Sequence, residues 1–304
     1  MGTRLLVSAG LVVLALGQTA CAHDVGASGG STSSSSSKPL DVTRLSLGDG
    51  RITTSGPRRS YVYVCQTPMG PGGASASGSW IDGSRWDLTK KPTVDGSVDW
   101  PDATYRVTRS GSKRAIAGNG LPTHTTGVFP IQESDDAYQF DRNPNSISAQ
   151  TVDVTLTAKP AKASKPACVT GGAIGIMDSG AVFFDALDAG GNDAAAHEIQ
   201  DTCGGHPQQQ GSYHYHALPS CIKTGSKSAH SKRIGWAFDG FPIYGPRGDA
   251  GKYMRNSDLD ACHGHTHTIK VDGTRVRMYH YHATMEYPYT LGCFRGTPVR
   301  SGGP

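Results

Sequence analysis

Hydrophobic and polar residues alternate along several short stretches of this chain. Tyrosine and valine alternate from Arg59 to Val64, just before Cys65, and the alternation returns in Tyr105–Thr108 and Val152–Thr157. Such a period of two places successive side chains on opposite faces of a β-strand. No long stretch keeps an apolar residue every 3.6 positions, which is the period of an amphipathic helix. The pattern predicts a mainly β protein with short strands and few, short helices.

Turn-forming residues separate these stretches. The chain has 40 glycines and 18 prolines, which favour many turns. Asp82-Gly83 and Asp95-Gly96 lie among three tryptophans and predict a meander of short strands. Ala158–Ala167 is rich in lysine, proline and alanine and is the expected internal boundary. Asp193–Gln200 is expected to form about two helical turns, capped by Asn192 or Asp193.

Beyond this boundary the chain repeats itself at an interval of about sixty residues. Three segments recur in the same order: Gly175–Gly180 as Gly235–Gly240, Asp201–His206 as Asp260–His265, and Tyr213–His216 as Tyr279–His282. The order and the nearly constant interval predict an internal tandem duplication within one domain. We expect two units, at about 168–228 and 229–297, that fold alike around a pseudo-two-fold axis.

The duplication also restricts the disulfide pairing. Six cysteines remain if Cys21 is set aside, and six cysteines allow fifteen connectivities. Equivalent bonds inside each unit would be Cys203–Cys221 and Cys262–Cys293, which leaves Cys65–Cys168. Exchange between units, as Cys203–Cys262 and Cys221–Cys293, also respects the symmetry. In both cases the domain is stapled by disulfides and its cysteines are oxidised, so we do not expect them to bind metal.

The N-terminus carries an export signal. Leu5–Leu16 is apolar but too short to span a bilayer, as in the hydrophobic region of a secretory signal. Gln18–Cys21 is similar to a bacterial lipobox, although leucine is preferred at its first position. The alternative is cleavage after Ala22. A flexible Gly/Ser-rich tether, Gly26–Ser37, and the even number of remaining cysteines favour lipidation of Cys21.

We therefore expect secretion across the bacterial cytoplasmic membrane and a lipoprotein anchored to a membrane, or otherwise a periplasmic or extracellular protein. The expected order is a signal peptide and lipobox (1–21), a tether (22–40), an N-terminal β-rich part (41–165), the duplicated core (166–297) and a tail (298–304). The net charge of +4 is modest and the basic residues are scattered, which does not favour nucleic-acid binding.

Histidine is concentrated in the duplicated core. Ten of the twelve histidines lie between His197 and His282. In a strand, each Tyr-His-Tyr-His segment puts two imidazoles on one face, and we expect both segments to converge in one pocket. The predicted metal ligands, joined by a histidine from each preceding loop, are His206, His214, His216, His265, His280 and His282. Imidazoles suit zinc, copper or nickel. The alternative is a polar core in which backbone carbonyls satisfy the rings.

Other residues are weaker candidates for the same site. Two carboxylates precede the histidine loops and are either further ligands or acceptors that fix the imidazole tautomers. His263 and His267 flank His265 at alternate positions, and His124 lies in a turn of the N-terminal part. Asp239 belongs to an Asp-Gly pair that offers a catalytic base or, more simply, a hairpin turn. These candidates are Asp201, Asp260, His263, His267, His124 and Asp239.

The repeated motifs resemble those of the YHYH family, a group of extracytoplasmic proteins. The resemblance covers about residues 119–297. It rests on Gly205–Pro207, Tyr213–His216, Asp239–Pro246, Leu259–Cys262, Tyr279–His282 and Tyr287–Tyr289. It implies a YHYH domain and export from the cytoplasm, and it implies no particular reaction.

Three functions remain open from the sequence. The first is the binding, storage or delivery of a transition metal. The second is metal-assisted hydrolysis at the cell envelope, with water at an open coordination position. The third is a structural or glycan-binding module that uses tryptophan and tyrosine rings for stacking. The familiar motifs of serine hydrolases, nucleotide-binding proteins and zinc proteases are not found, so the sequence leaves open whether the protein is an enzyme. It identifies no protein or glycan partner.

Overall fold

A computed structural model describes residues 38–67 and 75–299. The predicted signal peptide, the lipobox with Cys21 and most of the tether lie outside the described residues. The described residues form one compact unit. Within the described ranges, no helix has the length and apolar character needed to cross a membrane. The structure is mainly β with a few short helices, as the alternating pattern predicts.

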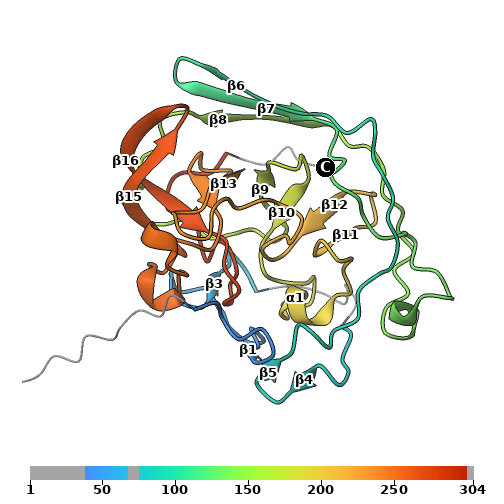
Figure 1. The fold of residues 1–304 in the computed structure, drawn as a ribbon. Helices are drawn as coiled ribbons and strands as arrows, with labels where there is room; N and C mark the ends of the chain where they lie inside the picture. The colour runs from blue at the N-terminus through green and yellow to red at the C-terminus, as the bar shows by residue number, and fades with distance from the viewer. Residues whose placement is uncertain (1–37, 68–74, 300–304) are drawn as a thin grey trace, which may run out of the picture. The chain divides into compact units, whose positions relative to one another are not determined.

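An eight-stranded sheet organises the second half of the chain (Figure 1). Its strands lie side by side in the order β11-β12-β10-β9-β13-β14-β16-β15. Their bounds are β9 Ala173–Met177, β10 Val182–Phe184, β11 Gly205–Pro207, β12 Tyr213–Tyr215, β13 Arg233–Ala237, β14 Pro242–Tyr244, β15 Gly264–Val271 and β16 Thr274–His282. β12 and β16 carry the tyrosine-histidine motifs, and four strands separate them in the sheet.

The two halves of this sheet have the same pairing. β9 and β13 pair antiparallel at the centre, and each then pairs antiparallel with the next strand, β10 or β14. That strand pairs parallel with the motif strand, with Phe183 opposite Tyr215 and Ile243 opposite Tyr281. An antiparallel edge strand, β11 or β15, completes each half. This is the arrangement that an internal duplication would produce, although the duplication itself remains a prediction.

A second, antiparallel sheet contains β6 Tyr105–Ser110, β7 Lys113–Gly118 and β8 Val152–Thr157. The strands predicted at Tyr105–Thr108 and Val152–Thr157 are thus confirmed, and β8 alternates between buried and exposed residues. Buried Arg114 of β7 joins this sheet to the larger one. Its guanidinium carbon lies 3.5 Å from the ring centroid of Trp236, and its Nη2 lies 2.6 Å from the carboxylate of Asp272.

The N-terminal part forms shorter strands. They are β1 Leu45–Ser46, β2 Ile52–Thr53, β3 Val62–Tyr63, β4 Ile81–Asp82 and β5 Arg85–Trp86. Gly83, with a φ of 57°, lies in the turn between β4 and β5, as the Asp-Gly pair predicts. The strand predicted at Arg59–Val64 is shorter than expected because its backbone amides bond to separate segments. The amide of Tyr63 donates to Gly292, and that of Val64 donates to Thr53.

The helices are single turns. They are α1 Ala194–His197 and the 3₁₀ helices η1 Asp136–Gln139, η2 Asp249–Gly251 and η3 Asn256–Asp258. The helix predicted at Asp193–Gln200 is therefore too long. Its N-cap residue is Asp193, but the backbone is already extended at Glu198, with φ −95° and ψ 140°. This early end turns the Glu198 side chain away from the helix and towards β11 and β12, where it meets their histidines.

All three predicted disulfides are present. Cys203–Cys221 and Cys262–Cys293 lie inside the two units, and Cys65–Cys168 joins the N-terminal part to the core. The pairing between units is therefore wrong. Three disulfides fit an extracytoplasmic protein, because the cytosol keeps thiols reduced.

Candidate functional site

The alternation within each motif separates its tyrosines from its histidines. Tyr213 and Tyr279 are buried, and their hydroxyls donate to Asp201 at 3.0 and 2.9 Å and to Asp260 at 2.9 Å. Each aspartate also accepts the backbone amide of the cysteine two residues later. Asp201 and Asp260 therefore stabilise turns and bind tyrosines on the face opposite the histidines. The hypothesis that they assist the imidazoles directly is wrong.

The two motifs do not meet in one pocket. Each motif strand pairs with the neighbouring strands of its own half of the sheet, which leaves β10, β9, β13 and β14 between β12 and β16. The imidazoles consequently form two groups, His206, His214 and His216 in one and His230, His265, His280 and His282 in the other. We call the first group, together with Glu198, the carboxylate site, and the second group the imidazole site. The prediction of a single shared cluster is wrong.

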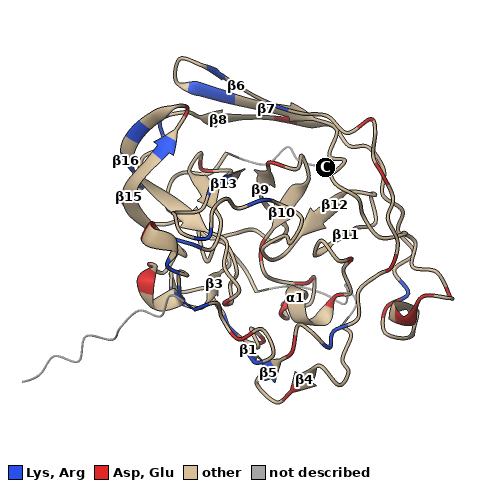
Figure 2. Ribbon diagram, in the orientation of Figure 1, with Lys and Arg blue, Asp and Glu red and all other residues tan. Residues whose placement is uncertain are grey.

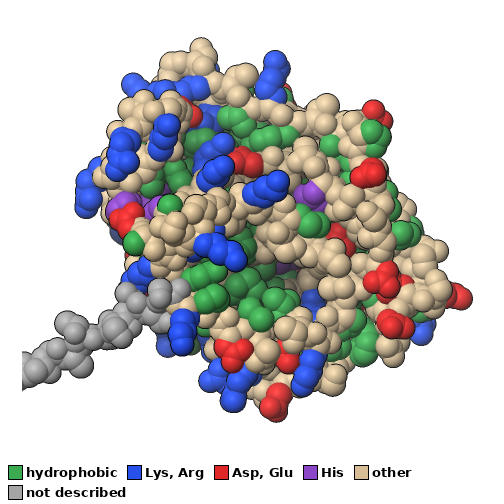
Figure 3. Space-filling model, in the orientation of Figure 1, with side chains coloured by type: hydrophobic (Ala, Val, Ile, Leu, Met, Phe, Trp, Pro, Cys, Tyr) green, Lys and Arg blue, Asp and Glu red, His purple; other side chains and the backbone are tan. Residues whose placement is uncertain are grey.

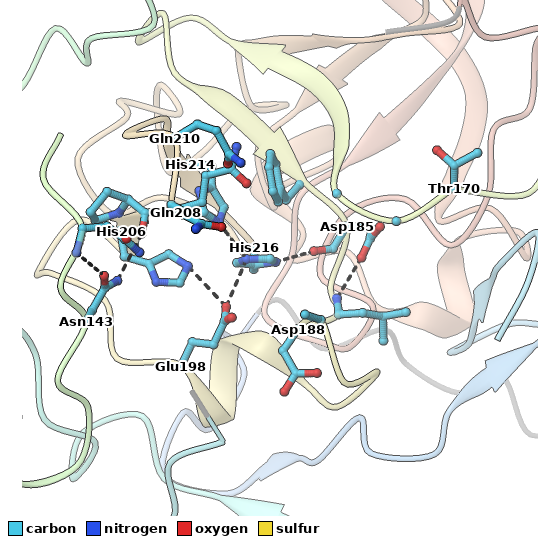
Figure 4. A pocket seen from close by; sticks show the side chains of 18 of the residues that line it. Asn143, Thr170, Asp185, Asp188, Glu198, His206, Gln208, Gln210, His214 and His216 are labelled. Carbon is cyan, nitrogen blue, oxygen red and sulfur yellow. Dashed lines mark hydrogen bonds and ion pairs between the residues drawn. The ribbon is translucent and has the colours of Figure 1, made fainter. Parts of the chain in front are cut away.

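The carboxylate site brings ring nitrogens and a carboxylate oxygen close together. The Nε2 atoms of His214 and His216 lie 3.1 Å apart. Glu198 Oε2 lies 3.1 Å from His216 Nε2 and 3.2 Å from His206 Nε2 (Figure 4). The residue opposite His214 in the β11–β12 pairing is His206. All four side chains are at most 9% exposed, so they meet inside the protein rather than at its surface.

Backbone carbonyls determine the tautomers of the two motif histidines. His214 Nδ1 lies 3.1 Å from the carbonyl oxygen of Ser212, and His216 Nδ1 lies 2.6 Å from that of Asp185. A carbonyl only accepts, so each Nδ1 carries the proton and donates it. The Nε2 atom of neutral His214 is then left with a lone pair that points into the site, whereas His216 Nε2 faces the carboxylate of Glu198. The ring of Phe184 stacks on His214, with 3.9 Å between ring centroids, and holds its plane.

Charge at the carboxylate site is concentrated on Glu198. Burial opposes its charged form, but the imidazoles of His206 and His216 outweigh burial and hold the pKa of Glu198 well below its usual range. Burial also opposes the charged form of His216, yet the nearby Glu198 raises the pKa of that imidazole above its ordinary value. Burial and the neighbouring imidazoles lower the pKa of His214. The carboxylate therefore remains charged and offers its oxygens to a cation.

The carboxylate site faces a cavity of about 750 Å³. Its wall contains amide and carboxylate side chains, including Asn143, Gln208, Gln210, Asp141 and Asp188 (Figure 4). No Lys or Arg is among the described residues that line it. Exposed basic residues lie elsewhere, on β6, β7, β15 and β16 (Figure 2). The cavity thus suits a neutral or cationic molecule better than a phosphate or carboxylate.

The imidazole site lies where β15 and β16 meet the segment before β13. The Nε2 atom of His280 is 3.1 Å from those of His265 and His282, and 3.2 Å from that of His230. The Nε2 atoms of His265 and His282 are 3.2 Å apart. Figure 3 shows histidine side chains at the surface over β15 and β16. Two of the rings are fully buried and two are partly exposed, so the site lies just below the surface.

The imidazoles of this second group favour the neutral form. Burial and neighbouring imidazoles lower the pKa of His265 to about 4 and that of His280 to about 2. The same causes lower the pKa of His282 well below its usual value. A neutral imidazole has one unprotonated ring nitrogen, and the lone pair of that nitrogen is what binds a metal ion.

The remaining predicted histidines lie outside both donor groups. His263 precedes β15 and has a φ of 69°, so its side chain does not follow the alternation of side chains along that strand. Its Nε2 lies 3.0 Å from the hydroxyl of Thr284. His267 Nε2 lies 2.7 Å from the exposed carboxylate of Asp249. His124 contacts the hydroxyl of Tyr215, on the tyrosine face of β12.

The simpler interpretation of Asp239 agrees with its contacts. One oxygen accepts the amide of Phe241 in the turn, and the other accepts the hydroxyl of Tyr281. Both contacts are structural, and neither involves a histidine. The tryptophans offered for stacking are largely enclosed, since Trp80 and Trp86 are 1% and 2% exposed.

Two residues of these sites are missing from the sequence prediction. Glu198 follows a helix that ends early, and no spacing in the sequence indicates that end. His230 has no histidine sixty residues earlier, where Thr170 stands, so comparison of the repeats omits it. The concentration of histidines after His197 was the one available signal for His230.

The comparisons with known proteins agree with the resemblance over part of its length. The model of a family described as YHYH protein matches residues 153–254, which include the carboxylate site and the first motif. The second motif lies beyond this match. No curated protein and no solved structure matches the chain.

Proposed function

We propose that the region matched by the YHYH family model, residues 153–254, binds a divalent transition-metal ion through His206, His214 and His216. Glu198 lies beside the ion and supplies negative charge. Three imidazoles suit zinc, copper or nickel. A protein that only binds, stores or delivers the metal needs nothing further than this site.

The spacing of the donor atoms carries the proposal. Zinc–nitrogen bonds of 2.0–2.1 Å in a regular tetrahedron separate the ligand atoms by about 3.3–3.4 Å. His214 and His216 present their Nε2 atoms at 3.1 Å, within a few tenths of an ångström of that value. His206 is 5% exposed; its Nε2 lies 3.2 Å from Glu198 Oε2, and its Nδ1 has no hydrogen-bond partner among the described residues.

Equilibrium dialysis against zinc, with protein that has no histidine tag, tests the proposal. We expect His214→Ala to bind one zinc ion fewer per chain than the wild type, because only two of the three imidazole ligands remain at the carboxylate site. Tyr213→Phe is the matched control, since it changes the neighbouring residue of the same strand and leaves the imidazoles intact. It should lower stability by about 1–3 kcal/mol, because Asp201 loses the hydrogen bonds from the Tyr213 hydroxyl, and it should still bind zinc. Equal zinc content in His214→Ala and wild type would refute the site.

Metal-dependent hydrolysis is a second candidate, supported by Glu198 and the cavity. Three protein ligands leave a position for water, and a bound metal lowers the pKa of that water to about 7. The carboxylate of Glu198 lies beside two of the ligands, so its position would allow it to accept the proton of the water as general base. The absence of Lys and Arg from the described lining favours a neutral or cationic substrate over a phosphate ester.

Glu198→Gln separates binding from hydrolysis. We expect this variant to keep its zinc and to lose hydrolysis of neutral esters, amides or glycosides about 10²–10⁴-fold, the usual contribution of a general base. Stoichiometry is measured by dialysis, and rates are measured on a panel that includes phosphate monoesters. If wild-type protein loaded with zinc cleaves nothing in the panel, the binding function remains and the hydrolase proposal fails.

The proposed site of action is the cell envelope. The disulfides support export, and a lipid anchor at Cys21 would hold the domain at the membrane through its tether. This anchor rests on the sequence alone, since Cys21 lies outside the described residues.

A further inference from the structure

We propose that His230, His265, His280 and His282 form a second, independent metal site that holds a divalent ion such as Zn²⁺ by imidazoles alone. The ion would tie the segment before β13 to the β15–β16 hairpin. This proposal does not depend on the carboxylate site, because the two sites share no ligand.

Four donor separations carry the proposal. They are 3.1 Å for His265–His280 and His280–His282, and 3.2 Å for His230–His280 and His265–His282, all between Nε2 atoms. Four of the six edges of a donor tetrahedron are thus close to the 3.3–3.4 Å that zinc–nitrogen bonds require, to within about 0.3 Å. Nitrogen pairs at this separation repel each other unless a proton or a metal lies between them.

The ring tautomers direct the lone pairs into the same space. His282 Nδ1 lies 2.7 Å from the carbonyl oxygen of Gly245, and His230 Nδ1 lies 2.9 Å from that of Ser231. Each Nδ1 therefore donates its proton to the backbone, and each Nε2 keeps its lone pair for the site. Such carbonyl partners are typical of the outer contacts that orient metal-binding histidines.

The fourth group distinguishes this site from the carboxylate site. Each site takes two histidines from a motif strand and a third from the paired edge strand, β11 or β15. The carboxylate site then meets a carboxylate, Glu198, and the imidazole site meets a fourth imidazole, His230. Four protein ligands close a zinc site, and closed sites are structural, whereas open ones suit catalysis.

The position of His230 indicates what a closed site would stabilise. Residues 217–232 form no helix or strand, and Lys223 and Lys227 in this segment are exposed. The segment is held partly by Arg247, whose guanidinium donates to Thr224 and Gly225. Coordination of His230 would add a further attachment, to β15 and β16. The bound ion should therefore protect this segment from proteolysis after the two lysines.

Zinc binding and trypsin digestion of the full chain test the second site. Wild type should bind two zinc ions per chain, His230→Ala one and His214→Ala one. Zinc should slow cleavage after Lys223 and Lys227 in wild type and in His214→Ala, by tenfold or more, and have no effect in His230→Ala. Tyr279→Phe is the matched control, because it changes the tyrosine next to His280 and keeps every imidazole. His265→Asn gives a second test if His230→Ala misfolds.

The outcomes separate the two proposals. Two zinc ions in His230→Ala, or equal digestion with and without zinc in wild type, would overturn the imidazole site. One zinc ion in wild type that survives in His214→Ala and disappears in His230→Ala would support the imidazole site and remove the carboxylate site. One zinc ion that disappears only in His214→Ala would do the reverse.

Discussion

Removal of metal by a chelator should lower the free energy of unfolding by about 4 kcal/mol for each site, when zinc had been present at about a thousand times its dissociation constant. With both sites filled the loss is about 8 kcal/mol, which exceeds half of the stability of most domains. The reason is that the ligands of each site come from separate segments. His206 and His214 lie on paired strands, and His230 lies fifty residues before His280, so only the folded chain brings them together.

Urea unfolding of the protein with EDTA and with a defined excess of zinc measures this loss. A variant carrying both His214→Ala and His230→Ala is the control, and its unfolding should be insensitive to zinc. Magnesium should also have no effect on wild type, because it prefers oxygen ligands over imidazoles. Unfolding midpoints of wild type that coincide with EDTA and with zinc would contradict both metal sites together.

The parts of the fold that follow from local pattern and symmetry could be predicted from the sequence. The alternation in Val152–Thr157 describes a strand with one buried face, and the structure has that strand. The alternation in Tyr213–His216 separates tyrosines from histidines, because a strand has only two faces. The repeat leaves two symmetric disulfide pairings, and the structure has the one with equivalent bonds inside each unit, Cys203–Cys221 and Cys262–Cys293.

The composition of each site depends on tertiary structure that the sequence pattern does not specify. Strand order places β12 and β16 in different halves of the sheet, so a copied motif yields two sites instead of one. His263 fits the alternation of β15 in the sequence, but its left-handed backbone turns it towards Thr284. Glu198 enters a site because α1 stops after one turn. None of these features has a periodic signal in the sequence.

The two sites share one arrangement of strands and motif histidines, and they differ in the residue that joins those histidines from outside the strand pair. The tyrosines of each motif are buried against hydrogen-bond partners on one face, Asp201 and Ser179 in the first half and Asp260 and Asp239 in the second. This fixes the strand, so the histidines on the other face have defined positions. The residue that approaches from outside the strand pair then determines the chemistry. A carboxylate beside a cavity suits an open site, and a fourth imidazole suits a closed one.

Removal of the Cys65–Cys168 disulfide, as Cys65→Ser with Cys168→Ser, should destabilise the protein most among the three disulfides. This bond closes a loop with a sequence separation of 103 residues, and the loss of chain entropy in the unfolded state corresponds to about 4.7 kcal/mol for a loop of about 100 residues. Cys203–Cys221 has a separation of 18 residues, for which the same relation gives about 3 kcal/mol.

Urea unfolding of the two double variants, both free of metal, measures the difference. The native contacts around Cys65 should persist without the bond, because the amide of Cys65 donates to the carbonyl of Val169 at 2.9 Å and the amide of Val169 donates to the carbonyl of Tyr63 at 2.8 Å. The variant should therefore fold and bind zinc at low urea. A larger loss in Cys203→Ser with Cys221→Ser would contradict the prediction, and would mean that this shorter bond also maintains the turn at Asp201 that leads into β11.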